Sequence, residues 1–385
     1  MSMLELVFWL IFGLILFIYI GYALLIGLGS KLFPKPPTHW ANTQDLPSVC
    51  IIIPAFNEVT CLNQKVLNTL ALEYPTEKIK IIVITDGSSD GSETLNWADE
   101  RVFRLHQPQR EGKSAAINRA MPFSNAEITA ITDANTLLNS DALMALTAPF
   151  QWNSIGGVAG EKRIQTDFGN STSNEGLYWK YESRLKRWDA QAYSIVGAAG
   201  ELFAFRTHLF QPLETDAILD DFMLSVRIVE QGFRVGYAPN AQATESASPS
   251  LSAEWKRKIR IAAGVFQSLP RLDLPLKPSK YPLAWAIFIG HRWMRWMLAP
   301  PLLLILLPLH LHLGLSMGGL WLPFAGIHLS AYLLAGLGFA LNSFQVKIPF
   351  FYTPMYFVMM NAAMVAGAFR FFSGKQSVLW EKVRS

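Results

Sequence analysis

Acidic and amide side chains follow three short β-branched segments in the middle of the sequence, and they are the first candidates for chemistry. The segments are Val49–Ile53, Lys80–Thr85 and Ile128–Thr132, and the polar residues that follow them are Asn57, Glu58, Asp86 and Asp133. Helical patterns at 58–73 and 112–121 separate the segments, which is typical of an α/β sheet with parallel strands and helical crossovers. Because ligands bind at the carboxyl ends of such strands, we expect these side chains to share one edge.

The composition places this central part between two apolar flanks. The 385 residues are 51% hydrophobic and only 16% charged, against a usual charged share of about 25%, which excludes a disordered chain. The two cysteines exclude a small fold held together by disulfides. The apolar excess lies at both ends, so we expect a soluble domain over roughly 45–275 with membrane segments on either side.

The N-terminal flank predicts one transmembrane helix. Leu6–Gly29 is a stretch of 24 residues without a charge, and about 20 apolar residues span a bilayer. A cleaved signal peptide is the alternative, but its apolar region is only about 7–15 residues long and follows a positive segment. Here Lys31 and Lys35 come after the apolar run, so the positive-inside tendency places the middle of the chain in the cytoplasm.

The C-terminal flank predicts further spans. Met297–Val346 has no charged residue and contains Gly318-Gly319, which indicates a hairpin, and Ile348–Phe369 is another uncharged stretch. Tyr281–Trp296 mixes basic and aromatic residues, as interfacial helices do. Three spans after the first would leave the C-terminus outside, yet cationic residues favour the inside: Arg370, Lys375, Lys382 and Arg384. Either the last stretch is interfacial or 281–296 helps to span, and the sequence leaves both open.

Seven short segments in the middle of the chain carry a family resemblance. They are IIIPAFNE (51–58), TDGSSDGS (85–92), EGKSAAINRA (111–120), TDAN (132–135), GAAGELFAFR (197–206), LDDFMLSVR (219–227) and KRKIRIAAG (256–264). In this order the set resembles the family 2 glycosyltransferases. The flanking membrane pattern resembles their membrane-embedded branch, which includes hyaluronan, cellulose and chitin synthases and bacterial polysaccharide enzymes. Each segment alone is a weak signal, but seven in order are a specific one.

The resemblance implies a GT-A fold, which is an α/β nucleotide-sugar-binding domain with a Rossmann-like mixed sheet, here flanked by transmembrane helices. It divides the chain into an N-terminal transmembrane helix (1–30), a linker (31–47), the GT-A domain (48–275), an interfacial helix (281–299), membrane helices (300–372) and a cytoplasmic tail (373–385). We therefore expect an integral membrane protein, for example of the bacterial inner membrane, with its catalytic domain in the cytoplasm.

The resemblance also assigns residues to the sugar donor. The first segment holds the nucleotide in the family, Asp86 matches a carboxylate that contacts the uracil end, and Lys113 matches a basic residue near the nucleotide. A plain turn is the alternative for Asp86-Gly87, because both residue types favour turns. The residues assigned to the donor are Pro54, Ala55, Asn57, Glu58, Asp86, Lys113, Asp133, Arg257 and Arg260.

Asp133 and Asn135 stand where the family has its metal-binding DxD motif. Alternating residues after a strand put two oxygen ligands on one side, and Mg²⁺ or Mn²⁺ prefers such oxygens, with phosphates and waters completing an octahedron. Here Asn135 replaces the second aspartate, so an amide oxygen remains but one charge is missing. A turn or a helix cap explains Asn135, taken alone, equally well.

The pair Asp220-Asp221 matches the Glu-Asp pair of the family and is followed by Leu224 and Arg227 at the family's spacing. The resemblance makes Asp221 the catalytic base that takes the proton from an acceptor hydroxyl, a contribution of typically about 10²–10⁴ in rate. Asp220 also stands where the cap of a helix over 221–231 is expected. The residues assigned to the acceptor side are Gly200, Glu201 and Asp220.

The basic segment 256–264 departs from the Q-x-x-R-W pattern of the processive synthases. Arg257 replaces the glutamine, Arg260 matches the arginine and Ile261 replaces the tryptophan. Arg260 is expected to bind the diphosphate through forked bonds, whereas attraction to anionic lipid, about 1 kcal/mol per charge, is the alternative for Lys256 and Lys258. The missing tryptophan removes a stacking platform for an acceptor sugar, which argues against processive synthesis.

The expected function is that of a membrane-anchored, metal-dependent, inverting glycosyltransferase. Its donor is a nucleotide sugar, UDP-linked by resemblance, and its acceptor a saccharide or a lipid-linked saccharide in polysaccharide or glycolipid synthesis. One alternative is a single addition to lipid, as in dolichyl-phosphate or ceramide glycosyltransferases. Another is a non-catalytic membrane subunit that binds nucleotide sugars, with the departures at Asn135 and Asp220 as its support. Membrane lipids are expected partners, nucleic acid is not, and nothing in the sequence identifies a partner subunit.

Overall fold

The computed structural model describes residues 1–40, 42–165, 173–198, 200–246, 250–344, 346 and 348–375, and within these it describes all side chains except those of residues 43, 165 and 173–179. Two of the cationic residues that argue for an inside C-terminus, Lys382 and Arg384, lie outside the described residues, as does most of the expected tail 373–385.

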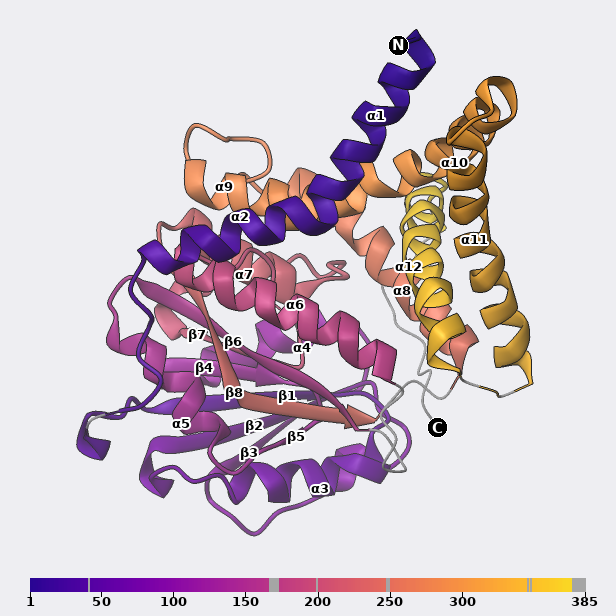
Figure 1. Cartoon of the computed structure of the whole chain (residues 1–385). Coiled ribbons are helices and arrows are strands. Elements are labelled where there is room, and N and C mark those ends of the chain that lie inside the picture. Colours follow the sequence, from indigo (N-terminus) through magenta and orange to yellow (C-terminus); the bar gives the residue numbers. More distant parts are fainter. Residues whose placement is uncertain are drawn as a thin grey trace.

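One mixed sheet of eight strands forms the centre of the molecule (Figure 1). The strands lie in the order β3-β2-β1-β4-β7-β6-β8-β5. Their bounds are β1 Val49–Ala55, β2 Ile79–Asp86, β3 Val102–Gln107, β4 Ile128–Thr132, β5 Leu137–Leu138, β6 Ile155–Gln165, β7 Leu202–Arg206 and β8 Arg234–Ser246. The three segments predicted from sequence are β1, β2 and β4, and β1 pairs in parallel with both of the others, as expected. Antiparallel pairing of β7 with β4 and β6 makes the sheet mixed.

Strand β1 is buried along its whole length, which explains its unbroken apolar sequence. Alternate side chains enter two separate cores, with Ile52 on one face of the sheet and Ile51 and Ile53 on the other. β2 lies on one side of β1 and β4 on the other, so the chain changes direction across the sheet between these strands. Such a switch point leaves a crevice at the carboxyl ends, where ligands bind in open α/β sheets.

Among the described residues, six α-helices belong to the central domain, and three of them lie close to the ranges predicted from the sequence. Their bounds are α3 Val59–Leu70, α4 Lys113–Ala120, α5 Ala142–Thr147, α6 Ser173–Ala192, α7 Asp220–Glu230 and α8 Leu251–Ser268. The helix expected at 112–121 begins one residue later, because Gly112 has a φ of 102°, outside the helical region. The N-terminus of α4 therefore starts at Lys113, next to the carboxyl ends of the central strands.

In the part of the chain that the structure describes, four helical stretches are long and apolar enough to cross a membrane: Met3–Leu32, Pro282–Met317, Trp321–Ser343 and Pro349–Phe372. The first consists of α1 Met3–Leu16, the π-helix η1 Phe17–Gly21, α2 Tyr22–Gly29 and a final short turn. The second joins α9 Pro282–Phe288, the π-helix η10 Ile289–Leu298 and α10 Ala299–Met317. The last two are α11 Trp321–Ser343 and α12 Pro349–Phe372.

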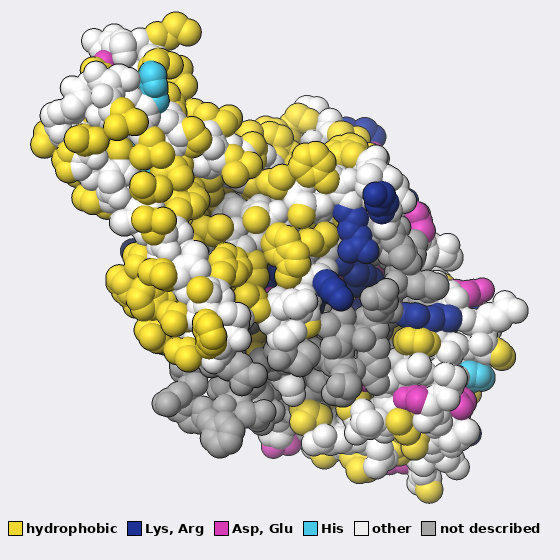
Figure 2. All heavy atoms as spheres, turned by 90° about the vertical axis from the view of Figure 1, so that its right-hand side faces the viewer, with side chains coloured by type: hydrophobic (Ala, Val, Ile, Leu, Met, Phe, Trp, Pro, Cys, Tyr) yellow, Lys and Arg dark blue, Asp and Glu magenta, His cyan; other side chains and the backbone are white. Residues whose placement is uncertain are grey.

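The predicted hairpin is confirmed, since α10 and α11 are joined at Gly318 and Gly319, both with positive φ. Segment 281–296, for which the sequence left an interfacial and a spanning role open, is continuous with α10 in the helical stretch Pro282–Met317. Figure 1 shows α9 and α2 lying across one end of the central domain, while α10, α11 and α12 stand beside it. Hydrophobic side chains cover this outer group of helices in Figure 2; exposed examples are Leu304, Leu315, Phe339, Phe350 and Phe369.

The contact between α12 and α8 depends on a glycine. A Cβ atom on Gly367 would lie 2.3 Å from the Cβ atom of Ala262 and 2.9 Å from the backbone nitrogen of Ala263. The two helices therefore touch backbone to backbone, and this contact fixes α8, the helix that carries Arg257 and Arg260, against a membrane helix.

Replacing Gly367 with valine is expected to push α12 away from α8 and to lower stability, because overpacking of this kind costs about 1–3 kcal/mol. Thermal unfolding of the detergent-purified protein measures the loss. Gly336→Val is the matched control, because a Cβ atom there has open space around it. Equal melting temperatures for the two variants would contradict the role of Gly367.

Candidate active site

The loops that follow β1 and β2 are locked to each other by hydrogen bonds. Asn57 has a φ of 53°, a left-handed conformation that asparagine adopts more readily than most residues, and its side-chain oxygen accepts from the backbone N–H of Ser89 at 2.9 Å. The backbone N–H of Glu58 donates to the hydroxyl of Ser92 at 2.9 Å. The predicted donor residues of the first segment therefore form one rigid edge: Pro54 and Ala55 end the buried strand β1, and Asn57 and Glu58 follow it.

Asp86 holds the loop that leads to α4. Its Oδ2 accepts from the backbone N–H groups of Glu111 at 3.0 Å and Gly112 at 2.6 Å, and its Oδ1 pairs with the guanidinium of Arg119. The carboxylate is buried. At Gly87, φ is 68° and a Cβ atom would meet the backbone nitrogen of Arg110 at 2.7 Å, so only glycine fits this approach. Asp86 is therefore more than a plain turn residue.

Lys113 brings three predicted site residues together. Its Nζ lies 2.8 Å from Oδ1 of Asp133 at the end of β4 and 3.2 Å from Oδ2 of Asp220 at the start of α7. Burial disfavours the charged amine, but attraction to Asp133, Asp220 and Asp221 outweighs it and holds the pKa of Lys113 above its ordinary value. Segments far apart in the sequence thus meet around one cation.

Asp221 lies beside this cluster, under Gly200. A Cβ atom on Gly200 would stand 3.3 Å from Oδ2 of Asp221 and 3.4 Å from Nζ of Lys113, so a side chain at this position would crowd both groups. Burial, followed by repulsion from Asp220, raises the pKa of Asp221 to about 7, although Lys113 opposes the shift. A carboxylate with a pKa near neutrality is well matched to take up a proton.

The expected capping role of Asp220 is wrong. Helix α7 begins at Asp220 itself, its cap position is Leu219, and no side chain caps the first turn. The carboxylate of Asp220 instead pairs with Lys113, because a half-buried lysine next to several acids attracts it more strongly than a single backbone N–H does. The helix still ends close to the predicted position, at Glu230, two residues before Gly232.

Glu201 and Arg257 have ionic partners that the sequence did not predict. Glu201 and Glu245 both pair with the buried amine of Lys162. Burial raises the pKa of Glu201, but Lys162 reverses the effect and brings it down to about 2. Arg257 makes a forked pair with Glu254, with nitrogen–oxygen distances of 2.9 and 2.8 Å. Its guanidinium is thus held by a carboxylate on its own helix.

Arg260 lies on α8, the helix that also carries Arg257. Burial lowers the pKa of Arg260, and the charges of Asp220 and Asp221 act against this. Among the described residues, His, Cys, Asp and Glu form no group of three or more that could hold a metal ion. Asp133 and the half-buried Asn135 are the oxygen donors that the β4 turn offers.

Lys65 is a residue of this site that sequence reasoning missed. It is fully buried, and its Nζ contacts the hydroxyls of Thr132 at 2.8 Å and Thr136 at 3.2 Å, on either side of the Asp133–Asn135 turn. The hydroxyl of Thr132 also donates to the backbone oxygen of Glu201 at 2.8 Å. The signal was present, because Lys65 occupies the apolar face of α3 at helical spacing with Leu62, Val66 and Thr69.

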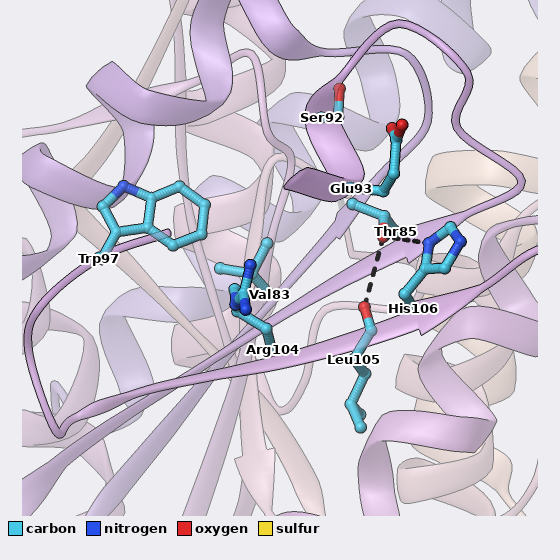
Figure 3. Close-up of a pocket in the computed structure, with 8 residues that line it drawn as sticks. All are labelled: Val83, Thr85, Ser92, Glu93, Trp97, Arg104, Leu105 and His106. Carbon is cyan, nitrogen blue, oxygen red and sulfur yellow. Dashed lines mark hydrogen bonds between the residues drawn. The ribbon is translucent and has the colours of Figure 1, made fainter. Parts of the chain in front are cut away.

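A separate cavity of about 150 Å³ lies at the β3 edge of the sheet (Figure 3). In Figure 3 the side chains of Trp97 and Arg104 lie on one side, and Glu93 and His106 lie on the other. The hydroxyl of Thr85 bonds with Nδ1 of His106 at 2.8 Å. The remaining lining residues are Val83, Ser92 and Leu105, so none of the predicted site residues lines this cavity.

The family profile described as glycosyltransferase-like family 2 matches residues 47–264, more than half of the chain. The chain belongs to this family. The match contains all the donor- and acceptor-side residues discussed above.

Bacterial proteins are the curated relatives of this family 2 glycosyltransferase. A poly-beta-1,6-N-acetyl-D-glucosamine synthase of Staphylococcus aureus is 26% identical over 261 residues, which are 64% of this chain and 62% of the relative. The probable glycosyltransferase YdaM of Bacillus subtilis is 25% identical over 238 residues, 58% of this chain and 56% of the relative. The chain thus matches about three fifths of the length of these proteins.

A solved structure shows the fold. The mannosyltransferase PcManGT from Pyrobaculum calidifontis, in complex with GDP-Man and Mn²⁺, superposes with a TM-score of 0.72 at 22% identity, over 96% of this chain and all of that one. The family 2 glycosyltransferase described here therefore has the GT-A fold with membrane-type helices, as predicted.

Replacing Lys65 with methionine is expected to raise stability near pH 7. Burial lowers the pKa of Lys65 from 10.5 to about 7, so the unfolded chain binds more protons between these values and the wild type gains stability as pH rises. The variant lacks this gain, which is about 1.4 kcal/mol per pH unit.

Melting temperatures in EDTA at pH 7 and pH 9.5 test the prediction. The melting temperature of Lys65→Met should exceed that of the wild type at pH 7, and this difference should be smaller by roughly 5 °C at pH 9.5. Lys256→Met, at an exposed position of α8, should show no such trend. An advantage that is the same at both pH values would contradict the argument.

Proposed function

We propose that this protein is a membrane-anchored, inverting glycosyltransferase that transfers a sugar from a nucleotide-sugar donor, UDP-linked, to a growing or lipid-linked saccharide. The observation that carries the proposal is the cluster in which Lys113 joins Asp133 and Asp220 beside Asp221, at the switch point of the sheet. The polysaccharide synthase among the relatives supports a saccharide acceptor.

Asp221 is the proposed base of a single displacement. Its carboxylate takes the proton of the acceptor hydroxyl while the hydroxyl oxygen bonds to the anomeric carbon. The bond from that carbon to the diphosphate oxygen breaks on the opposite face, and the nucleoside diphosphate leaves. The acceptor is proposed to approach Asp221 on the side of Gly200, which has no side chain to crowd the carboxylate, and the charges of Glu201 and Asp220 act on Asp221.

The donor is proposed to lie along the strand ends. The edge formed by Pro54, Ala55, Asn57 and Glu58 holds the nucleoside, with Asp86 fixing the loop behind it. Lys113 and Arg260 are the cations that face the leaving diphosphate, and Arg260 is the better placed of the two arginines because Arg257 is paired with Glu254.

A divalent cation, Mg²⁺ or Mn²⁺, fits the β4 turn. Asp133 and Asn135 offer a carboxylate and an amide oxygen, and hard cations in such sites are held by one or two protein oxygens plus phosphates and water. When bound, the ion neutralises charge on the leaving diphosphate. The Mn²⁺ in the mannosyltransferase of the same fold supports this assignment.

The four apolar helices support a membrane location. We place the catalytic domain on the cytoplasmic side of a bacterial inner membrane, because Lys31 and Lys35 follow the first span and nucleotide sugars are cytoplasmic donors. A single addition to a lipid acceptor is the second candidate, favoured by Ile261 in place of the stacking tryptophan. Product length separates the two.

Asp221→Asn is expected to lower the rate of transfer about 10²–10⁴-fold while the protein still folds, because it removes the base and keeps the shape. Wild-type membranes incubated with Mn²⁺ and a panel of nucleotide sugars provide the assay, with released nucleoside diphosphate as the readout. Equal release from the variant and the wild type would remove Asp221 from the mechanism.

The pH dependence of the wild-type rate tests the same group. The pKa of Asp221 is raised to about 7, and a base acts only when deprotonated, so kcat/KM is expected to rise as pH increases through about 7. A rate that is flat from pH 5.5 to 8.5 would count against the assignment.

Asn135→Asp is expected to lower the Mn²⁺ concentration that gives half-maximal rate by about tenfold, equivalent to about 1.4 kcal/mol, because it adds a charged ligand. Titration of Mn²⁺ into EDTA-treated enzyme measures the change. Asp133→Asn is the opposite control and should abolish the increase in rate on addition of Mn²⁺. An unchanged Mn²⁺ requirement in Asn135→Asp would exclude Asn135 as a ligand.

A further inference from the structure

Three parts of the chain that are far apart in sequence meet at a buried ionic network. Glu182 of α6 lies 2.9 Å from Nη1 of Arg292, 3.1 Å from Nη1 of Arg295 and 3.3 Å from Nε2 of His291, all on the π-helix η10. The side chains of Glu182 and His291 are both only 3% exposed. A helix of the central domain is thus joined to the membrane segment through a buried carboxylate and partly buried arginines.

The same network includes the N-terminal span. Asp189, seven residues after Glu182 on α6, pairs with Nδ1 of His291. It also accepts a hydrogen bond from the hydroxyl of Tyr22 on α2 at 2.6 Å. Removing one partner of a buried ion pair leaves an uncompensated charge and is strongly unfavourable. The network therefore holds α2, α6 and η10 in one arrangement.

Arg292 extends the network into the active site. Its Nη2 donates to the backbone oxygen of Gly197 at 3.2 Å. The next N–H along the chain, that of Ala198, donates to the hydroxyl of Ser225 on α7 at 2.9 Å. Gly197 and Ala198 are therefore held from the membrane side by Arg292 and from the catalytic side by Ser225.

The helix that carries Asp221 also packs against the membrane segment. Phe222, the residue after Asp221, packs against Phe288 of α9 and Trp296 of η10, with ring centroids 6.5 and 5.8 Å apart. A Cβ atom on Gly197 would meet the Phe222 ring at 2.7 Å, so the Gly197 stretch and the base helix are in direct contact. η10 is a π-helix of 10 residues, a conformation that is rare and often found at functional sites.

We propose that Arg292 is a positioning residue that sets the acceptor side of the site from the membrane segment. Through its two contacts it fixes Gly197 relative to Glu182, and so holds the chain three residues before Gly200, which lies against the Asp221 carboxylate. The proposal rests on the proposed function, because it assumes that the acceptor reaches Asp221 on the side of Gly200. An acceptor that arrives along the membrane face would meet this segment first.

Arg292→Met tests the proposal, with Arg295→Met as the matched control that loses a cation from the same carboxylate. Membranes containing each variant receive a radiolabelled nucleotide sugar that the wild type uses. Label incorporated into acceptor and label released as free sugar are measured separately, together with the KM for the donor. A misplaced acceptor lowers the incorporation of label and leaves the donor KM unchanged. A general structural defect lowers the incorporation of label and also weakens donor binding.

We expect Arg292→Met to lose incorporation roughly 10- to 100-fold relative to free-sugar release, with an unchanged donor KM. Arg292→Lys, which still donates to the Gly197 oxygen, should recover part of the loss. Ser225→Ala should show the same selective defect, since it removes the other anchor. These two variants keep the test decisive if Arg292→Met folds poorly.

Hydrogen–deuterium exchange gives a readout that needs no activity. Peptides that contain Ala198 should exchange faster in Arg292→Met than in Arg295→Met. Equal exchange and equal incorporation in the two variants would overturn the positioning role while the enzyme remains a glycosyltransferase. A wild type that releases no nucleoside diphosphate from any donor would overturn the proposed function and this role with it.

Discussion

The ion pairs of Lys113 with Asp133 and Asp220 are the interaction on which the site depends. They hold two acids around a single amine, with Asp221 beside them, an arrangement that would be repulsive without the amine. Burial, together with repulsion from Asp220, raises the pKa of Asp221 to about 7. One lysine therefore both assembles the acidic cluster and leaves the neighbouring carboxylate able to accept a proton.

The sheet explains why these residues can meet at all. Strands β2 and β4 lie on opposite sides of β1, so the loops after β1 and β4 diverge and leave a crevice at their carboxyl ends. Asp86 lies at one end of this crevice and holds the loop before α4. This places Lys113, the first residue of α4, next to the carboxylates. The antiparallel strand β7, paired with β4, brings Glu201 to the other end. Backbone topology thus brings these residues to one place, where the ion pairs of Lys113 hold the carboxylates together.

Local patterns were enough to predict the strands, the hairpin of α10 and α11, and the residues that line the strand ends, because each depends on neighbours in sequence. Ionic partners were not predictable in the same way. Asp220 follows the rule for a helix cap, but a lysine from another helix takes its carboxylate, and Arg257 is neutralised by Glu254 one turn away. Lys65 escaped notice because a lysine is normally assumed to face solvent, although its position on the apolar face of α3 indicated burial.

The membrane helices are part of the same physical argument. Buried ion pairs add little net stability, so their value lies in specifying one arrangement of the parts that carry them. Here the pairs of Glu182 and Asp189 with η10 specify how the central domain packs on the apolar helices, and the hydrogen bond of Arg292 to Gly197 joins the same segment to the chain next to α7. A domain with the same strands and carboxylates but without these helices would lack this constraint. In addition to supplying apolar surface, the flanks therefore fix part of the backbone close to Asp221.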